Sequence, residues 1–407
     1  MTVSTALLVA AIIVAAVVLL ELSARRWLWR STKYRVHPPN TELIVGLSEH
    51  VSDRLAPVVL NRYNALGERA SQRESQSTTG LRVLVAGGSA AECFFLDQDL
   101  AWPARLESLL NEPTALEAIG VSAVGVTTLA RSAMRSRDVA EILERSNESL
   151  DRAAVVVLHL GSSDALQWLV RGAPKSYDDG RADVADMFLR HPEMVFRWRM
   201  REMALTECIR RVQSAVRPSK NVRNAGRFLR SARAMRGKGE YLEGIPDTSG
   251  LLENLERGIR RCFAAALRSG GVVYFVPQIY YWKEHYEPRE EAMLWLGGIG
   301  DASTGAQVKY FLRHDHVRDL MQLVNSKCLS IASDMGVCYA DITGRVRICE
   351  ANFYDDFHLT AAGANELAGA IADVIVADHQ SGMVGARSHP EEPAQPPNRL
   401  HDAAVSS

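Results

Sequence analysis

Five short apolar runs alternate with helical patterns over residues 81–379, and this alternation constrains the fold more than any other feature of the chain. The clearest run is AAVVVLHL at residues 153–160, and the others lie at 82–86, 115–122, 271–276 and 337–342. Such runs are typical of strands buried on both faces. Helical patterns are found at residues 102–110, 129–150, 315–335 and 360–377. The sequence therefore predicts an α/β fold, a doubly wound five-stranded parallel sheet with helices on both faces.

The N-terminus carries an apolar segment of a different kind. Residues 6–20 have no polar side chain, and Val3 and Leu22 extend the run toward 20 positions. A helix of about 20 residues crosses the hydrocarbon core of a bilayer. A cleaved signal peptide is the alternative, but it would carry positive charge before its apolar core, and the first five side chains carry none. We therefore expect residues 3–22 to be a retained transmembrane anchor.

The membrane orientation of this single-pass protein stays open. Five basic residues follow the apolar run within a short distance and none precedes it: Arg25, Arg26, Arg30, Lys33 and Arg35. The positive-inside bias would place the following domain in the cytoplasm, but long domains are also translocated against such a bias.

The remaining regions differ in composition. Residues 23–80 are expected to be a juxtamembrane linker, and the proline-containing residues 380–407 a disordered tail. Residues 81–379 form the predicted domain, with a basic helical insertion at about 171–260. Between Arg190 and Lys238 there are 12 Arg and 2 Lys against 3 Glu, a net charge near +11, and helices are expected around 195–216 and 224–235. This segment is either a solvated insertion or a surface for anionic lipid headgroups or an acidic glycan.

Composition also limits the kinds of partner. The whole chain has a net charge of −1, which gives no indication of a nucleic-acid partner. The six cysteines show no C-x-x-C spacing, so a structural zinc site is not expected. We expect no metal and no cofactor.

Two polar motifs lie where the sheet should end. Ser89 follows the first predicted strand through Gly87 and Gly88. A serine on such a turn exposes its hydroxyl at the carboxyl edge of the sheet, although a turn of this composition could also cradle a phosphate or serve only as a connection. Asp355 and His358, three residues apart, precede the last predicted helix. A carboxylate can there hold one imidazole nitrogen while the other takes a proton from a hydroxyl. Both motifs are expected on one sheet edge.

These motifs resemble the sequence blocks of SGNH/GDSL hydrolases. Residues 87–92 (G-G-S-x-x-E) resemble the first block in its G-G-S-x-x-E variant, and residues 355–360 (D-x-x-H-L-T) resemble the final block. Residues 125–128 (GVTT) are similar to the second block, and residues 161–164 (GSSD) occupy the place of the third, G-x-N-D. Residues 61–69 (NRYNALGER) resemble an N-x-x-G-x-R segment of membrane-anchored members. The resemblance spans residues 61–375, except for much of the basic insertion.

The resemblance implies a three-layer, flavodoxin-like sheet and a catalytic role for each matched residue. Ser89 would be the nucleophile, His358 the general base and Asp355 its orienting carboxylate. The N–H groups of Ser89 and Gly125 would form the oxyanion hole together with the residue at position 163. The third-block asparagine, which donates to the oxyanion, is Ser163 in this chain. We expect Glu92 to support the nucleophile turn by hydrogen bonding.

The implied function is that of a serine-dependent ester hydrolase or O-acyltransferase. Its substrate would be an acyl ester on a carbohydrate or lipid, and the acyl group would pass through an acyl-serine. The alternative is a catalytically degenerate scaffold on the same fold, which the substitution at Ser163 favours. A nucleotide-binding domain fits less well, because the chain has neither a P-loop nor a complete G-x-G-x-x-G motif.

Overall fold

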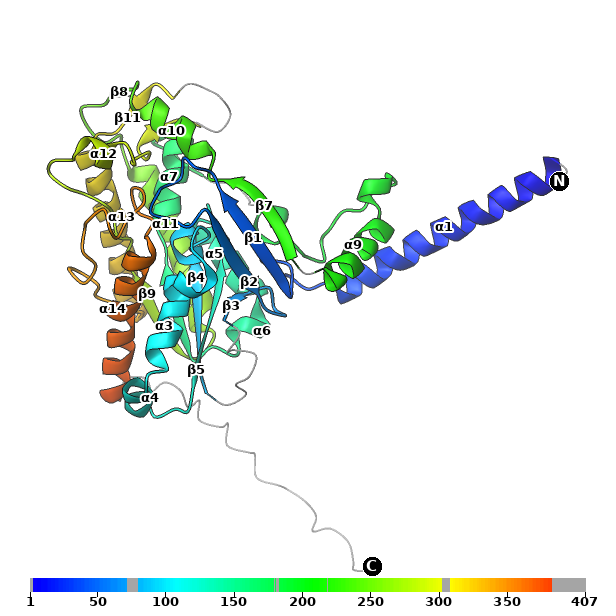
Figure 1. Cartoon of the computed structure of the whole chain (residues 1–407), viewed down its shortest axis with the longest axis horizontal. Coiled ribbons are helices and arrows are strands. Elements are labelled where there is room, and N and C mark those ends of the chain that lie inside the picture. Colours follow the sequence, from blue (N-terminus) through cyan, green and yellow to red (C-terminus); the bar gives the residue numbers. More distant parts are fainter. Residues whose placement is uncertain are drawn as a thin grey trace, which may run out of the picture.

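The computed structural model describes residues 3–71, 80–178, 180, 183–217, 219–301 and 308–382, so nearly all of the expected tail at 380–407 lies outside the described residues. Its centre is a parallel sheet (Figure 1), in which the strand order is β12-β9-β6-β4-β5. The five strands are β4 (Leu81–Gly87), β5 (Val124–Ala130), β6 (Val155–His159), β9 (Val272–Val276) and β12 (Cys338–Tyr339). In chain order this is 2-1-3-4-5, the flavodoxin-like order, with the switch point between β4 and β6. The predicted five-stranded, doubly wound core is confirmed.

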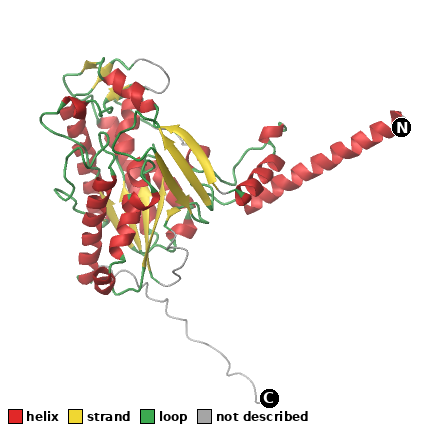
Figure 2. Cartoon of the chain, in the orientation of Figure 1, coloured by secondary structure: helices red, strands yellow, loops and turns green. Residues whose placement is uncertain are grey.

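Helices cover both faces of the sheet (Figure 2). On one face α11 packs against α5 and α13, and on the other α14 packs against α3 and α4. The bounds are α3 (Trp102–Leu110), α4 (Pro113–Ile119), α5 (Ser136–Arg145), α11 (Ser249–Leu267), α13 (His314–Met335) and α14 (Ala361–Gln380).

The alternation of side chains along the central strands produces two separate cores. On β4, Leu84 and Ala86 belong to one buried cluster, whereas Val83 and Val85 belong to the other. Successive side chains of a strand point to opposite faces, so a strand covered on both sides must be apolar at every position. This requirement explains why these strands could be recognised from the sequence.

One predicted strand is wrong. Residues 115–122 were expected to form the second strand, but they overlap helix α4, and the strand is β5, which begins at Val124. Pro113 occupies the first turn of α4, where its missing N–H costs nothing, and Gly120 ends the helix with φ 78°. Of the helix predicted at 129–150, the structure contains the two shorter helices α5 and α6 (Asn147–Leu150).

The sheet is larger than predicted, because four further strands extend it to nine. These are β3 (Arg69–Ala70), β2 (Val58–Tyr63), β1 (Thr41–Leu47) and β7 (Ser219–Ala225), in that order outward from β5. The first three come from the region expected to be a linker, and β7 comes from the basic insertion. Both regions are therefore part of the folded domain.

Short elements complete the described chain. They are α2 (Ser89–Glu92), α7 (Ser162–Val170), α8 (Val184–Met187), α10 (Phe228–Arg236), α12 (Pro288–Glu291), and the 3-10 turns η2 (Gln98–Leu100) and η3 (Met200–Glu202). A second, three-stranded sheet contains β8 (Glu240–Tyr241), β10 (Gly298–Ile299) and β11 (Tyr310–Phe311).

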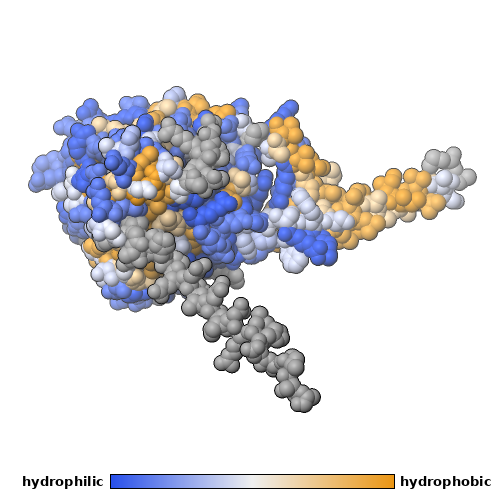
Figure 3. Space-filling view, turned by 90° about the horizontal axis from the view of Figure 1, so that it is seen from below, coloured by the Kyte–Doolittle hydropathy of each residue, from blue (hydrophilic) through white to orange (hydrophobic). Residues whose placement is uncertain are grey.

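Helix α1 (Val3–Ser31) projects from the domain as a hydrophobic rod (Figure 3). It is long and apolar enough to cross a membrane, and the most apolar window of 18 residues is not buried against the rest of the protein. Helix α9 (Ala204–Val216) packs beside its domain-side end (Figure 1). The helix expected around residues 195–216 is thus shorter than predicted and begins at Ala204.

Candidate active site

Ser89 follows the carboxyl end of β4, and the two positions that precede it have room only for glycine. A Cβ on Gly87 would lie 2.3 Å from the carbonyl oxygen of His159, and a Cβ on Gly88 would lie 2.8 Å from Ser163 Oγ. The chain therefore passes very close to the end of β6 before Ser89 begins helix α2. The same contact places Ser163, in the first turn of α7, beside the serine.

The segment after Ser89 is held by side chains of β2 and β3, which pair antiparallel with each other. Arg69, on β3, is 4% exposed and donates to the carbonyl oxygens of Glu92, Cys93 and Leu96 at 2.5, 2.9 and 2.8 Å. Asn61 Nδ2, on β2, donates to the carbonyl of Phe94 at 3.1 Å. The region 61–69 that resembled an upstream family segment thus contacts the nucleophile turn directly.

Glu92 fixes the same turn from the other side. Its Oε2 accepts from the N–H and hydroxyl of Ser132, at 2.7 and 2.5 Å, in the loop after β5. The carboxyl is buried, and burial raises its pKa. Glu92 therefore joins the loops that follow β4 and β5, in the hydrogen-bonding role expected from the sequence.

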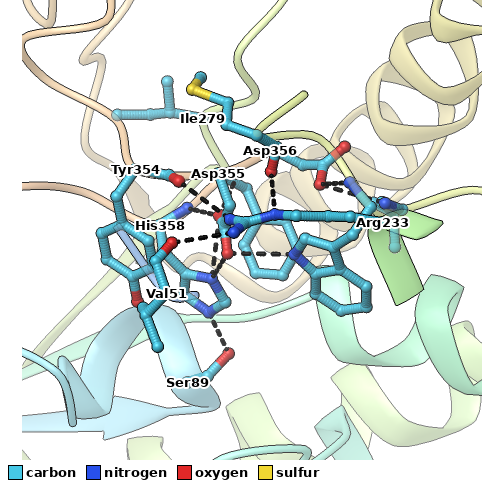
Figure 4. Close-up of polar contacts among 12 residues, drawn as sticks. Val51, Ser89, Arg233, Ile279, Tyr354, Asp355, Asp356 and His358 are labelled. Carbon is cyan, nitrogen blue, oxygen red and sulfur yellow. Dashed lines mark hydrogen bonds and ion pairs between the residues drawn. The ribbon is translucent and has the colours of Figure 1, made fainter. Parts of the chain in front are cut away.

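Ser89, His358 and Asp355 form one chain of hydrogen bonds (Figure 4). His358 Nε2 lies 2.8 Å from Ser89 Oγ, and His358 Nδ1 lies 2.8 Å from Asp355 Oδ2. Asp355 Oδ1 also accepts from the backbone N–H groups of Phe357 and His358, at 3.1 and 2.8 Å, and Oδ2 accepts from Trp295 Nε1 at 3.1 Å. The carboxylate orients the imidazole, and the imidazole faces the hydroxyl.

The two neighbouring aspartates differ in their ionisation. Burial opposes the charge on Asp355, but the adjacent imidazole and the N–H donors outweigh it and lower the pKa of this carboxyl. For Asp356, burial and the charge of Asp355 raise the pKa to about 6. Asp356 Oδ2 accepts from the N–H groups of Trp295 and Leu296, at 2.8 and 3.1 Å. Asp356 thus holds the 295–296 backbone, whereas Asp355 holds the imidazole.

The basic insertion reaches the same loop through Arg233. This side chain, on α10, donates to the carbonyl oxygens of Met293 and Val51, at 2.9 and 3.0 Å, and also contacts the carbonyls of His50 and Tyr354. Tyr354 in turn stacks on the His358 ring, with centroids 5.5 Å apart and planes 6° apart. No sequence pattern identified Arg233, because its partners are backbone carbonyls of distant segments.

Gly125 does not reach the site. It pairs with Arg82 near the amino ends of β5 and β4, whereas Ser89 follows their carboxyl ends, at the level of Ala130. At about 3.3 Å per residue, this separation is roughly 16 Å along the sheet. The expected oxyanion role of Gly125 is therefore wrong, and the error arose because the strand was placed about nine residues too early. The loop that follows the real strand contains Ala133, which has φ 66° and lines the cavity beside Ser89.

A cavity of about 1200 Å³ opens beside the serine and histidine. Its walls are mixed. The aromatic side chains are Phe94, Phe95, Phe228, Trp295, Phe311, Tyr354 and Phe357, and the charged or polar ones include Glu49, His50, Ser132, Ser163, Arg227, Arg230 and Asp301. Helix α10 of the insertion supplies one wall, so the insertion shapes the space in front of Ser89. Across the described segments, no group of three or more His, Cys, Asp or Glu residues could hold a metal ion.

His159 is a buried histidine near the site, and no catalytic role was expected for it. It ends β6, is 3% exposed, and neither ring nitrogen has a hydrogen-bond partner in the described part of the chain. Burial, together with the positive charge that His358 can carry, lowers its pKa to about 4. The ring is therefore neutral at pH 7.

Comparisons with known proteins find likenesses among solved structures alone. No protein-family model and no curated protein matches the chain. Among solved structures, an acetylxylan esterase from Geobacillus stearothermophilus is similar at a TM-score of 0.37 and 12% identity, over 73% of this chain and 94% of that one. A phospholipase A1 from Streptomyces albidoflavus is similar at 0.34 and 16%, over 72% and 99% of the two chains. A lipolytic protein of the G-D-S-L family from Desulfitobacterium hafniense is similar at 0.34 and 10%, over 72% and 98%.

Proposed function

We propose that the chain is a serine-dependent ester hydrolase or O-acyltransferase of the SGNH type, with Ser89 as nucleophile. The observation that carries this proposal is the continuous hydrogen-bonded set of Ser89, His358 and Asp355 at the wall of a large cavity. Nucleophile, base and orienting carboxylate in this order are the requirements for nucleophilic acyl transfer.

The first half-reaction forms the acyl-enzyme. Ser89 Oγ attacks the ester carbonyl while His358 Nε2 takes the hydroxyl proton, and the buried Asp355 carboxylate stabilises the imidazolium that results. The carbonyl oxygen becomes an oxyanion, for which the donors available at the cavity wall are the backbone N–H groups of Ser89 and Ala133 and the hydroxyl of Ser163. When the carbonyl reforms, the ester C–O bond breaks, the alcohol takes the proton from His358, and the acyl group stays on Ser89.

The second half-reaction regenerates the serine. His358 takes a proton from the acceptor, whose oxygen attacks the acyl carbon, and the proton returns to Ser89 Oγ as the bond to the serine breaks. Water as acceptor makes the chain a hydrolase, and a sugar or lipid hydroxyl makes it a transferase. The mixed aromatic and polar walls of the cavity suit an acyl ester carried on a glycan or lipid.

We assign α1 the role of a single-pass membrane anchor. Its side chains over the apolar run are exposed to the surroundings of the protein, among them Leu7, Ile12, Val14 and Leu19 at 66, 59, 62 and 66%. Water is an unfavourable environment for so much apolar surface. Such an anchor would hold the cavity close to a bilayer that carries the ester.

Labelling with a fluorophosphonate probe tests the proposal on the full chain in detergent micelles. We expect labelling of the wild type, none of Ser89→Ala, and strongly slowed labelling of His358→Ala. Ser231→Ala removes a hydroxyl on the cavity wall that is not part of the Ser89–His358–Asp355 set, and this variant should label normally. Wild-type protein that is folded but unlabelled would instead favour the catalytically degenerate scaffold, the alternative indicated by a serine at position 163.

A further inference from the structure

The turn that precedes α9 lies level with the end of the apolar run of α1. Both carboxylate oxygens of Glu21 accept backbone N–H groups from the start of α9, Oε1 from Ala204 at 2.9 Å and Oε2 from Leu205 at 3.0 Å. Glu21 is fully buried, and Arg25 donates to it at 2.8 Å. Since the run without polar side chains ends at residue 20, this cap fixes the start of α9 at the boundary between the apolar and polar parts of α1.

The two helices are joined beyond this cap as well. Ala24 and Leu28 of α1 are buried against Ala204, with Leu205 and other partly buried apolar side chains around them. Further along, Arg211 Nη1 donates to Thr32 Oγ1 at 2.9 Å. Helix α9 therefore runs beside α1 from Glu21 to Thr32, and its N-terminal end is the end nearer to the apolar run.

Residues 195–201 (VFRWRMR), which we call the 195–201 turn, alternate apolar and basic side chains at this end. Val195, Trp198 and Met200 are 81, 55 and 84% exposed. The turn is closed by backbone hydrogen bonds, from the Arg197 N–H to the Glu202 carbonyl at 3.1 Å and from the Glu202 N–H to the Arg199 carbonyl at 2.7 Å. Large apolar side chains are thus displayed in water on a defined turn.

The charge around this turn has one predominant sign. Residues 195–202 contain three arginines and one glutamate. Glu202 lies 3.8 Å from Arg197 and 3.7 Å from Arg199, which leaves a net charge of +2. In addition, the Arg25 guanidinium lies 4.9 Å from the Trp198 ring centre. Tryptophan and arginine side by side suit the interface of a bilayer, where apolar rings meet anionic headgroups.

We infer that the 195–201 turn enters the interface of an anionic lipid bilayer, the same bilayer that α1 spans. This inference rests on the proposed anchor role of α1, but not on the proposed catalysis. A bilayer fits better than a protein partner because the turn is fixed beside the anchor, at the level where the hydrocarbon would end. The chain then contacts the membrane at two points, and the second contact limits how the domain can tilt about α1.

Quenching of tryptophan fluorescence by lipids brominated on their acyl chains tests the inference. The full chain is reconstituted into vesicles of phosphatidylcholine and phosphatidylglycerol. Trp27, Trp29 and Trp198 are the side chains expected at the bilayer, so Trp198→Phe should remove roughly a third of the quenched emission. Trp282→Phe is the matched control, because Trp282 lies in the domain beneath Arg318, whose guanidinium is 4.3 Å from its ring centre. This variant should leave the quenched emission unchanged.

A second set of variants tests the role of charge. Replacing Arg197, Arg199 and Arg201 together with Gln should reduce the quenching of Trp198 in anionic vesicles to its level in pure phosphatidylcholine. The same replacement at Arg217, Arg223 and Lys238 should not. If the first triple variant is quenched like the wild type, the turn does not recognise anionic headgroups and the inference is overturned.

The variant Trp27→Phe/Trp29→Phe separates failure of the inference from failure of the anchor. If quenching is lost in this variant but is unchanged by Trp198→Phe, then α1 is a membrane anchor and the 195–201 turn does not contact the bilayer. If the wild type shows no quenching, the anchor fails and the inference fails with it. Neither result depends on acyl transfer, since Ser89→Ala should behave like the wild type in every vesicle.

Discussion

At the scale of single residues, the site depends on how much the Ser163 hydroxyl contributes where the resembled family has an asparagine. Ser163 is 5% exposed and lies beside Gly88, and its side-chain hydroxyl makes no hydrogen bond within the described residues. Its hydroxyl is therefore free to donate to an oxyanion. A hydroxyl rotates about its C–O bond, so it is less well oriented than an amide but can still contribute a donor.

We expect Ser163→Ala to lower kcat for a soluble ester by about tenfold and to change KM little. Removing an oxyanion donor in subtilisin lowers kcat by about 10²–10³, and a rotating hydroxyl should contribute less. Steady-state kinetics with a nitrophenyl ester would measure the effect, with Ser231→Ala as the control. Equal kcat values for Ser163→Ala and the wild type would show that the hydroxyl does not contact the oxyanion.

Asp356 should make stability depend on pH. Its pKa in the folded protein is raised to about 6 from the usual 3.8, so between these values the folded state binds a proton that the unfolded state has lost. Stability contributed by this group is then present at low pH and falls as the pH rises from about 4 to 6. The full difference corresponds to about 3 kcal/mol.

Comparing the wild type with Asp356→Asn isolates this effect, because the amide cannot ionise but its oxygen can still accept the N–H groups of Trp295 and Leu296. We expect the free energy of unfolding of the wild type to fall relative to that of the variant between pH 4 and pH 7. Urea denaturation at the two pH values measures it. A difference that is independent of pH would contradict the raised pKa.

At the scale of elements, strands β2 and β3 hold the turn that contains Ser89 in place. Arg69 donates to three carbonyls of residues 92–96, and its Nε also donates to Gln98 Oε1 at 3.2 Å. Arg69→Lys should lower activity and destabilise the protein by about 2–4 kcal/mol, because one ammonium cannot reach all these acceptors. Arg62→Lys on neighbouring β2 is the control, since among the described residues the Arg62 side chain makes only a 3.3 Å ion pair with Glu42. Thermal denaturation and probe labelling would both report the change, and equal effects of the two variants would contradict this role.

The pairing of α9 with α1 depends on the Glu21 cap. Glu21→Ala leaves the N–H groups of Ala204 and Leu205 without their acceptor, a change that costs about 1 kcal/mol at a helix N-terminus. Amide hydrogen exchange over residues 204–216 should therefore become faster, whereas exchange in the sheet strands should not change. Unaltered exchange in α9 would mean that the apolar contacts of Leu28 are sufficient to hold it.

The elements that the sequence predicted are those whose pattern is set by burial. The strands β4, β6 and β9 are covered on both faces and consist almost entirely of apolar residues, and α3 begins at Trp102 and ends at Leu110, as predicted. The strands that were missed are β1, β2, β3 and β7, which continue the sheet beyond the parallel core: β7 (SKNVRNA), at the edge, is mostly exposed, and β3 has two residues. Pairing of such strands is decided by backbone partners far away in the sequence, which leave no periodic signal.

At the scale of the whole molecule, the candidate site is assembled from segments far apart in the chain. Ser89 follows the first strand of the core, and Asp355 and His358 come from the segment before the last helix. The cavity walls come from residues 48–50 between β1 and β2, from the insertion and from residues 295–301. The proximity of Ser89 to Asp355 and His358 was predictable, because strand ends of a doubly wound sheet converge on one edge. Arg233, Trp295 and Ala133 were not, because their roles depend on the tertiary contacts of loops.

The insertion should set the size of acyl group that the cavity accepts. Phe228, on α10, lines the cavity with an edge-on contact to Trp295, with ring centroids 5.8 Å apart and planes at 87°. Phe228→Ala removes a large side chain from the wall in front of Ser89, and we expect kcat/KM for an octanoyl ester to rise about tenfold relative to an acetyl ester. This corresponds to about 1.4 kcal/mol, a change that one or two buried methylene groups supply.

A series of nitrophenyl esters of increasing chain length would measure this preference, because the leaving group is constant and only the acyl group changes. Leu189→Ala, an exposed apolar side chain of the same insertion that does not line the cavity, is the control and should keep the wild-type preference. If Phe228→Ala lowers all the esters equally, α10 positions the site without selecting the acyl chain. A preference that shifts only in Phe228→Ala would show that the basic insertion is part of the substrate-binding wall, so that specificity and membrane contact would come from the same segment of the chain.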